Sequence, residues 1–415
     1  RPHRPQRDFL ALLNLGGREA LGVKWGVAAE GHWVWQWKDR IDRRFVRRFQ
    51  VLAPDGAPRR DFARPVRRRV ARAPCGGCAA KLEAPSLQRA LERLPPARPD
   101  DSVLLGLTRP DDAAAVRLPG GDVLLASVDA FRAFSDDAFL VGRVAAVNAL
   151  SDVFAKGGCP RHALALVGLP DATAERAEET LYQVLAGVRA ALDPLHVSLV
   201  GGHTTRGGEL YVGVVAMGSA DSAGDVLRLD GLEPGQRLVL SKPLGTGVVL
   251  AADMRGLARG AQVRAAHASM LRPNLAAARV ARSFGARACT DVTGFGLAGH
   301  LCEMLRASGV SAVLRLDALP ALDGALALLA RGVRSTAHER NALSRRDLAQ
   351  PERDWGIPLL ELIFDPQTSG GLLFAVEKDV AEDAVDALRA ADDRGAAVIG
   401  VVTASRPDGA LLAVE

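Results

Sequence analysis

Thr290-Asp291-Val292-Thr293-Gly294-Phe295-Gly296-Leu297-Ala298-Gly299 is a stretch in which an apolar strand turns on glycine and opens a helix. Its three glycines satisfy the dinucleotide pattern GxGxxG, and Asp317 lies near the expected downstream distance for a ribose-binding acid. Asp291, however, would place a negative charge beside a pyrophosphate, so we reject a dinucleotide site. A Mg²⁺ ion between this carboxylate and a phosphate would make the same aspartate favourable.

Strands alternate with helices on both sides of the chain's midpoint, which predicts an α+β (mixed α/β) class. A length of 415 residues suits two domains and an appendage. We expect boundaries that give 1–74, 75–224 and 225–415. In the first half we expect strands at 103–107, 113–116, 123–128, 163–167 and 211–217, with helices at 87–94, 139–156 and 174–192. In the second half we expect helices at 262–284, 299–308 and 380–394, with strands at 312–316, 371–376 and 397–402.

Three further aspartates lie in apolar surroundings, where an uncompensated carboxylate is costly to bury. Asp152 follows Asn148 by four residues on a predicted helix, so both project from one face. Asp129 is expected at the carboxyl end of a strand, where α/β sites commonly form. Asp111 and Asp112 point to opposite sides if the chain is extended, so one of them would be a ligand. Taken alone, a solvated Pro-Asp-Asp turn is the simpler interpretation of that pair.

A glycine pair and a cysteine pair complete the candidate chemistry. Gly201-Gly202-His203 follows a strand and is predicted to form either an anion-binding turn or an ordinary hairpin. Cys75 and Cys78 form a CxxC motif, but a zinc site needs two further ligands and no second CxxC or HxxxH occurs. A thioredoxin-like pair remains an alternative. A single reactive thiol beside Lys81 fits better, because a nearby positive charge favours the thiolate.

Charge is distributed unevenly along the chain. Residues 1–74 carry 18 Lys/Arg and seven Asp/Glu, a net charge of +11, which leaves −6 for the remainder given +5 overall. A basic leader on an acidic body differs from a uniformly basic protein, so no nucleic-acid partner is expected. Five cysteines indicate free thiols and a cytoplasmic location. There is no 18-residue uncharged apolar run and no signal peptide, and the start at Arg1 looks like a cut from a longer precursor.

The leader has its own pattern. Residues 9–15 read as a strand, Gly16-Gly17 as a turn and residues 20–23 as the return strand, followed by an aromatic and basic helix at 31–49. Four of the five tryptophans lie here. Such a helix can lie on a membrane or dock on a partner, although packing on an upstream domain is the simpler interpretation. Residues 51–74 are rich in proline and arginine and are expected to be a linker.

From Cys75 to the C-terminus the combined motifs resemble the selenophosphate synthetase (selenide, water dikinase) family of the aminoimidazole-ribonucleotide-synthetase-like superfamily. The motifs that carry the resemblance are Cys78-x-x-Lys81, Asp111-Asp112-Ala113-Ala114, Asn148-Ala149-Leu150-Ser151-Asp152, Gly201-Gly202-His203, Thr290-Asp291-Val292-Thr293-Gly294-Phe295-Gly296-Leu297 and Asp365-Pro366-Gln367-Thr368-Ser369-Gly370-Gly371-Leu372-Leu373. The resemblance implies a two-domain ATP-binding fold, usually a homodimer, that makes selenophosphate, AMP and phosphate from ATP, selenide and water. Residues 8–49 resemble the end of an FAD-dependent NADH-dehydrogenase-like domain that is fused ahead of some members, and without its dinucleotide-binding core we expect no flavin.

The resemblance also implies residue roles. Cys78 would be the catalytic thiol, Lys81 would act in catalysis and contact ATP phosphates, and Mg²⁺ would be the required metal. The magnesium ligands would be Asp112, Asp152 and Asp291. The other ATP-binding residues would be Asp111, Asp129, Gly201, Gly202 and His203, with Asp152 serving both.

Two alternatives stay open at this level. Thiamine-phosphate kinase and aminoimidazole ribonucleotide synthetase share the aspartates but have no need of Cys78-x-x-Lys81. A regulatory protein docked through the basic leader would bind ATP without turning it over.

Overall fold

The computed structural model describes residues 10–49, 76–77, 89–91, 93–95, 98–108, 110–349 and 358–415. The chain forms two compact units, Arg1–Ala71 and Arg72–Glu415. The boundaries that we expect at residues 75 and 225 stay predictions. The predicted linker at 51–74 lies outside the described residues, and only 89–91 and 93–94 of the helix predicted at 87–94 are described, with 89–91 helical.

The first unit is a three-stranded antiparallel sheet with one helix, as predicted for its hairpin and helix. It contains β1 (Ala11–Gly16), β2 (Glu19–Lys24), β3 (Val27–Gly31) and α1 (His32–Phe49), with the strands in the order β1-β2-β3. Gly16 and Gly17 have φ of 87° and 58°, a left-handed turn that glycine adopts without steric cost. Ala20 and Val34 are buried between sheet and helix.

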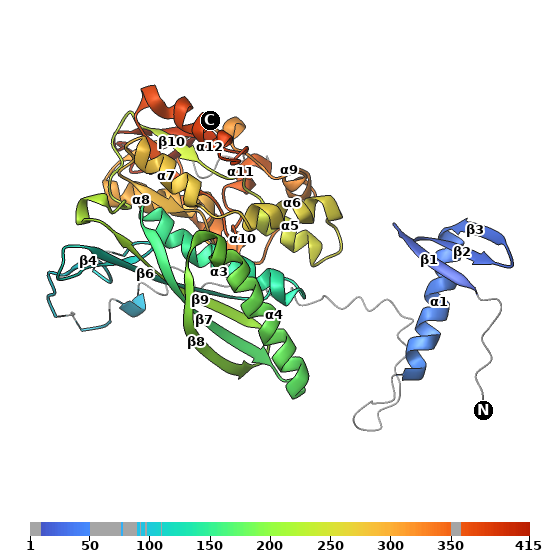
Figure 1. Cartoon of the computed structure of the whole chain (residues 1–415). Helices are drawn as coiled ribbons and strands as arrows, with labels where there is room; N and C mark the ends of the chain where they lie inside the picture. The colour runs from blue at the N-terminus through green and yellow to red at the C-terminus, as the bar shows by residue number, and fades with distance from the viewer. Residues whose placement is uncertain are drawn as a thin grey trace. The chain divides into compact units, whose positions relative to one another are not determined.

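The second unit begins with a six-stranded sheet in the order β4-β5-β6-β9-β7-β8, antiparallel except for the β7–β8 pair. Its strands are β4 (Val103–Leu105), β5 (Ala114–Arg117), β6 (Val123–Arg132), β7 (Cys159–Pro170), β8 (Ser198–Gly207) and β9 (Tyr211–Ala220). Helices α3 (Ala138–Ala155) and α4 (Ala174–Leu192) pack on it and on each other (Figure 1). Strands β6 and β7 are longer than predicted because β9 pairs with nearly their whole length.

A second six-stranded sheet has the order β11-β13-β10-β14-β12-β15. Its strands are β10 (Arg237–Leu240), β11 (Cys289–Asp291), β12 (Ser311–Leu314), β13 (Leu372–Val376), β14 (Ala397–Thr403) and β15 (Leu412–Val414). Its helices are α5 (Thr246–Asp253), α6 (Gly260–Met270), α7 (Leu275–Ser283), α8 (Gly296–Ser308), α9 (Ala325–Ala330), α10 (His338–Asn341), α11 (Pro358–Leu362) and α12 (Ala381–Ala390). The single helix predicted at 262–284 is wrong: Pro273 separates α6 from α7, since proline disfavours helical backbone before it.

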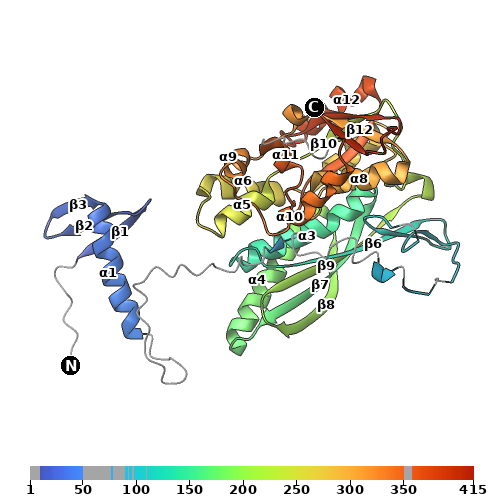
Figure 2. The ribbon, with the colours of Figure 1, turned by 180° about the vertical axis from the view of Figure 1, so that it is seen from behind.

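Helix α3 joins the two halves of this unit. It packs against β6 and β9 on one side and reaches β11, α6 and α7 on the other, and Figure 2 shows it between the two sheets. Among the described residues, α3 is the one helix long and apolar enough to cross a membrane, but 78% of its span is buried inside the protein. It is therefore a core helix, and its few polar side chains must find partners in the interior.

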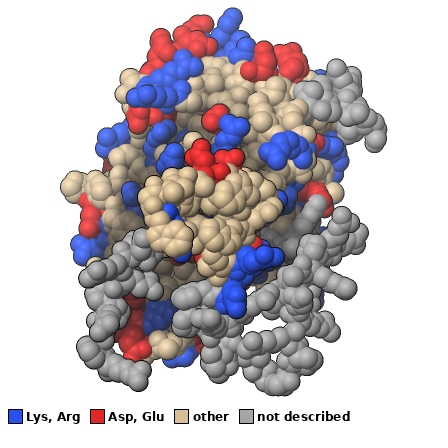
Figure 3. Space-filling model, turned by 90° about the vertical axis from the view of Figure 1, so that its right-hand side faces the viewer, with Lys and Arg blue, Asp and Glu red and all other residues tan. Residues whose placement is uncertain are grey.

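Charged side chains of both signs share the surface. On the face drawn in Figure 3, Lys and Arg side chains in blue are interspersed with Asp and Glu side chains in red.

Candidate active site

Asp111 and Asp112 lie just before β5 and follow Pro110. Both carboxylates face Lys156, which directly follows α3. The Lys156 side chain is fully buried; its Nζ forms an ion pair with Asp111, lies 3.1 Å from Asp112 Oδ2 and donates to the Cys289 carbonyl oxygen at 2.9 Å. The two carboxylates therefore turn toward one ammonium group and not to opposite sides, and the expectation that only one of them is a ligand stays a prediction.

The electrostatics keep Lys156 charged. Burial by itself lowers the pKa of Lys156, but the carboxylates of Asp112 and Asp111 outweigh that effect and leave the pKa above its ordinary value. Asp111 is held further by the backbone N–H groups of Asp112 at 2.8 Å and Leu229 at 3.1 Å. Two carboxylates around one ammonium leave a net negative charge, which suits a site that receives a cation.

The sequence reasoning missed Lys156. A signal was available, since Lys156 follows Asp152 by four residues and Asn148 by eight, on the same face of the apolar helix.

The polar face predicted on α3 is confirmed. Asn148 donates to Asp129 Oδ2 at 2.5 Å, and Ser127 donates to a carboxylate oxygen of Asp152. Asn148, Asp129 and Asp152 are buried, whereas Ser127 is partly buried. Each hydrogen bond satisfies a polar group that the apolar interior would otherwise penalise. Two carboxylates are thus fixed between α3 and β6.

Asp129 itself does not stand where the sequence placed it. It lies inside β6, opposite Val214 of β9, and not at a strand's carboxyl end. The prediction ended the strand too early. Strand β6 continues through Ala130, Phe131 and Arg132, and these residues pair with the first three residues of β9.

Asp291 reaches the same region from the second sheet. It ends β11 and is buried, and its neighbour Thr290 donates from Oγ1 to Asp112 Oδ1 at 2.9 Å. The strand, glycine turn and helix predicted for this stretch are confirmed: α8 begins at Gly296, whose φ is 73°. Two of the three predicted magnesium ligands, Asp112 and Asp291, therefore lie next to one threonine.

Gly201, Gly202 and His203 form neither of the predicted turns. They belong to β8, an exposed edge strand whose register aligns them with Leu164, Ala165 and Leu166 of β7. Parallel pairing keeps the chain extended through both glycines, and a side chain at Gly202 would collide with the Ala165 carbonyl oxygen. Since β9 and β7 separate β8 from β6, these residues lie about 14 Å from the strand that carries Asp129.

Cys75, Cys78 and Lys81 lie outside the described residues. Gly76 and Gly77, between the two cysteines, are described: Gly76 is close to the Ala133 carbonyl oxygen, and Gly77 is close to Thr368. Gly76 and Gly77 therefore lie against the Asp365–Gly371 turn and the chain that follows β6.

The carboxylates fit a metal shared with a nucleotide better than a closed protein site. No group of three or more His, Cys, Asp and Glu side chains in the described ranges is gathered closely enough to hold a metal ion. Magnesium is commonly bound by one or two carboxylates together with substrate phosphates. The buried oxygen donors of Asp112, Asp152 and Asp291 have the right chemistry for that arrangement.

Comparison with known proteins supplies the context for this geometry. Residues 110–220 match the N-terminal domain and residues 233–411 the C-terminal domain of AIR synthase related proteins. The chain is 39% identical over 331 residues to the selenide, water dikinase of Desulfitobacterium hafniense strain Y51, covering 79% of this chain and 94% of that protein. It is 38% identical over 339 residues to that of Geobacter metallireducens, covering 81% and 97%.

Solved structures support the fold. The HypE–HypF complex structure contains a chain that aligns with a TM-score of 0.59 at 17% identity, over 80% of this chain and 96% of that one. A thiamine-monophosphate kinase from Stenotrophomonas maltophilia K279a aligns with a TM-score of 0.55 at 24% identity, over 79% and 94%. These likenesses confirm the predicted two-domain fold of mixed sheets and helices.

Proposed function

The chain belongs to the selenide, water dikinase family and makes selenophosphate, AMP and phosphate from ATP, selenide and water, and we propose how its residues divide that work. The observation that carries the function is the similarity along nearly the full length of the curated relatives. Phosphoryl transfer needs positioned phosphates and compensation of charge more than covalent chemistry from the protein.

The nucleotide and its metal bind at the carboxylates between the two sheets. Asp112, Asp152 and Asp291 would hold Mg²⁺ only together with the ATP phosphates, and the ion would neutralise phosphate charge when bound. Asp111 and Asp129 contribute to the ATP site. The support is burial, because the interior disfavours unneutralised carboxylates. Asp111, Asp112, Asp129 and Asp152 are in addition held by hydrogen bonds or ion pairs.

Lys156 holds the carboxylates of Asp111 and Asp112 in place before substrate binds. Its ammonium group offsets one of the two charges of Asp111 and Asp112, and the backbone N–H of Leu229 fixes the orientation of Asp111. Without Lys156 the two carboxylates would repel each other in a buried place. Lys156 is therefore a positioning residue.

Cys78 and Lys81 act on the selenium side of the reaction. Cys78 handles the selenium nucleophile as a thiolate, and Lys81 offsets negative charge that develops on the phosphate. The support is the position of Gly77, which directly precedes Cys78: it lies against a turn whose Ser369 N–H donates to Asn148, the hydrogen-bond partner of Asp129.

The active form of the protein is a homodimer formed through the exposed face of the sheet that contains β6 and β8. Along β6 the residues that alternate with the buried ones, such as Val128 at 61% exposure, face away from α3 and α4. The edge strand β8 exposes Val200 in the same sheet. A homodimer would cover this apolar face and bring Gly201, Gly202 and His203 of β8 to a nucleotide bound by the other copy.

The remaining proposals concern location and the leader. A cytoplasmic location fits a chain whose described cysteines, Cys159, Cys289 and Cys302, are all free. The leader exposes Trp33 and Trp37 one helical turn apart on α1, which suits docking to a partner.

The test is release of AMP and phosphate from ATP under anaerobic conditions, with and without selenide. Asp112→Asn, Asp152→Asn and Asp291→Asn should each abolish magnesium-dependent ATP consumption and leave the far-UV circular dichroism unchanged. Asp317→Asn is the matched control, because this exposed acid belongs only to the rejected dinucleotide pattern. Near-normal turnover in the three site variants would refute the metal assignment, and nucleotide binding without AMP release would favour a regulatory role.

A further inference from the structure

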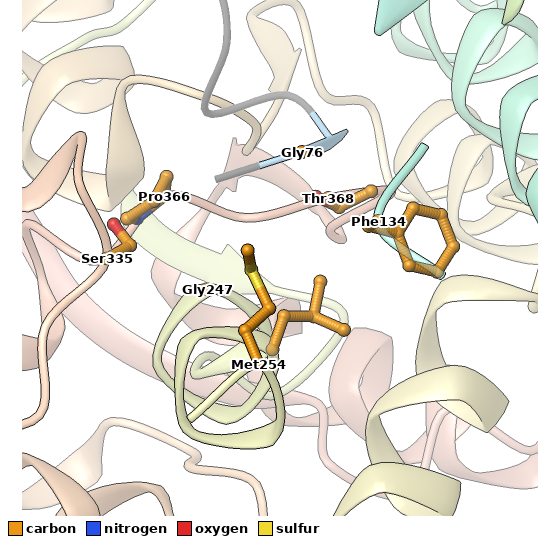
Figure 4. A pocket seen from close by; sticks show the side chains of 8 residues that line it. Gly76, Phe134, Gly247, Met254, Ser335, Pro366 and Thr368 are labelled. Atoms are coloured by element: carbon orange, nitrogen blue, oxygen red, sulfur yellow. The ribbon is translucent and has the colours of Figure 1, made fainter. Parts of the chain in front are cut away.

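The two glycines between Cys75 and Cys78 lie so close to neighbouring parts of the protein that neither position has room for a side chain. A Cβ at Gly76 would lie 2.5 Å from the Ala133 carbonyl oxygen, well inside van der Waals contact. At Gly77, where φ is 68°, a Cβ would collide with Thr368 Oγ1 and lie 3.4 Å from its Cγ2. Figure 4 shows Gly76 beside Thr368 and Phe134 around a small pocket that Met254 also lines.

Thr368 is itself held firmly. It is buried, and its backbone N–H donates to Thr246 Oγ1 at 2.9 Å. Thr246 also donates to Gln367 Oε1, which in addition accepts from the backbone N–H of Gly245 at 3.0 Å. The start of α5 therefore fixes the turn that faces Gly77.

The next residue, Ser369, contacts the nucleotide side of the site. Its φ of 53° is unusual for a residue with a side chain and persists only where the surroundings impose it. All three of its polar groups are used: N–H donates to Asn148 Oδ1 at 2.9 Å, Oγ donates to the Met270 carbonyl at 2.7 Å, and the carbonyl accepts from Lys242 Nζ at 3.2 Å.

Asn148 completes the connection, because its amide nitrogen donates to Asp129, a predicted ATP-binding residue. Two consecutive residues thus face two parts of the site. Thr368 contacts the segment that carries the predicted thiol, and Ser369 contacts the side chain that orients a predicted nucleotide-binding carboxylate.

We propose that Thr368 is a positioning residue that seats Gly77, the residue directly before Cys78, and that Ser369 ties this seat to the nucleotide side through Asn148. This proposal rests on the function proposed for Cys78. The seat fixes the position of Gly77, the residue directly before Cys78, relative to the ATP-binding carboxylates. A displacement of about 1 Å between reacting groups can cost about 10²-fold in rate.

The test is a rescue experiment in the full-length protein. Gly77→Ala should lower kcat for selenide-dependent AMP formation about 10²-fold, with little change in KM for ATP. Adding Thr368→Ala removes Oγ1 and Cγ2 and leaves Cβ at 3.5 Å, an ordinary contact. The double variant should recover about tenfold. Recovery should be incomplete, because alanine still disfavours the positive φ.

Gly76→Ala is the matched control. Its added methyl group meets a backbone oxygen, so Thr368→Ala should not rescue it. A loss of stability alone would not distinguish the two glycines in this way. If Thr368→Ala restores kcat equally in both glycine variants, or in neither, the proposal that Thr368 positions Gly77 is wrong.

A second measurement separates this proposal from the role of Cys78. In a Cys75→Ser background, the rate of Cys78 alkylation by iodoacetamide should change with Gly77→Ala and return toward the starting value with Thr368→Ala. If Cys78→Ser retains full selenophosphate synthesis, the function proposed for Cys78 fails, while the alkylation rescue still decides the seat. If Cys78→Ser is inactive and the alkylation rate does not respond, only the seat fails.

Discussion

Replacing Lys156 with methionine is the sharpest test of the electrostatic arrangement. The Lys156 side chain is fully buried, and the side chains of Asp111 and Asp112 are only 3% and 12% exposed. Methionine retains most of the packing volume but removes the charge. The variant leaves two neighbouring carboxylates inside the protein with no cation beside them.

The magnitude follows from the distances. At 3.1 Å and an effective dielectric constant of about 20, the Lys156–Asp112 attraction alone is about 5 kcal/mol. Removing one partner of a buried pair typically costs about 3–5 kcal/mol after the structure relaxes. We expect Lys156→Met to lose about that much unfolding free energy at pH 7, and Lys156→Met combined with Asp111→Asn and Asp112→Asn to recover a large part.

The assay is urea unfolding followed by far-UV circular dichroism, which reports a shift of the midpoint. Lys378→Met is the control: this lysine is exposed, so its effect should stay within about 0.5 kcal/mol. A loss below about 1 kcal/mol for Lys156→Met would refute the reasoning. So would a triple variant that is less stable than the single one.

Three further predictions concern other parts of the chain. Cys78→Ser should lose selenophosphate formation while Cys75→Ser is milder, because Cys78 has the family's spacing to Lys81; the reverse ranking would move the active thiol to Cys75. Removing residues 1–70 should leave turnover of ATP with selenide intact and weaken salt-sensitive attachment to a partner or an anionic membrane; a truncated protein that cannot turn over ATP would assign the leader to the active site. Burial lowers the pKa of Lys242 to about 7, so the folded state disfavours the ammonium form. The free-energy cost of losing that proton on folding disappears as pH rises toward the higher pKa that Lys242 has in the unfolded chain. Wild-type stability relative to Lys242→Met should therefore rise by about 2 kcal/mol between pH 7 and 9, and a flat difference in urea midpoints would contradict this.

Local patterns predicted many elements correctly. The period of α4 placed its ends at residues 174 and 192, and the strand, turn and helix around Asp291 were found from a buried acid beside glycine. The shared face of Asn148 and Asp152 followed from helical geometry. These features depend on residues a few positions apart, which is the range that sequence periodicity reports.

Other features depended on pairing between distant segments. The length of β6, and with it the position of Asp129, is set by β9 some 80 residues away along the chain. The extended form of Gly201-Gly202-His203 is imposed by β7, since the local glycine pair is equally compatible with a turn. Proline broke the helix predicted at 262–284, a signal that was present in the sequence.

The sequence by itself determined the fold class and the set of acidic residues in apolar surroundings, because these follow from local periodicity, and the family was identified from the resemblance of its combined motifs. The tertiary structure alone decided which charges meet. Lys156 lies 45 residues from Asp111 in the sequence and donates to a carbonyl 133 residues away. Ser369 reaches Asn148 across 221 residues. Burial makes these contacts matter, since an interior charge or polar group without its partner costs several kcal/mol, whereas the same group on the surface costs almost nothing.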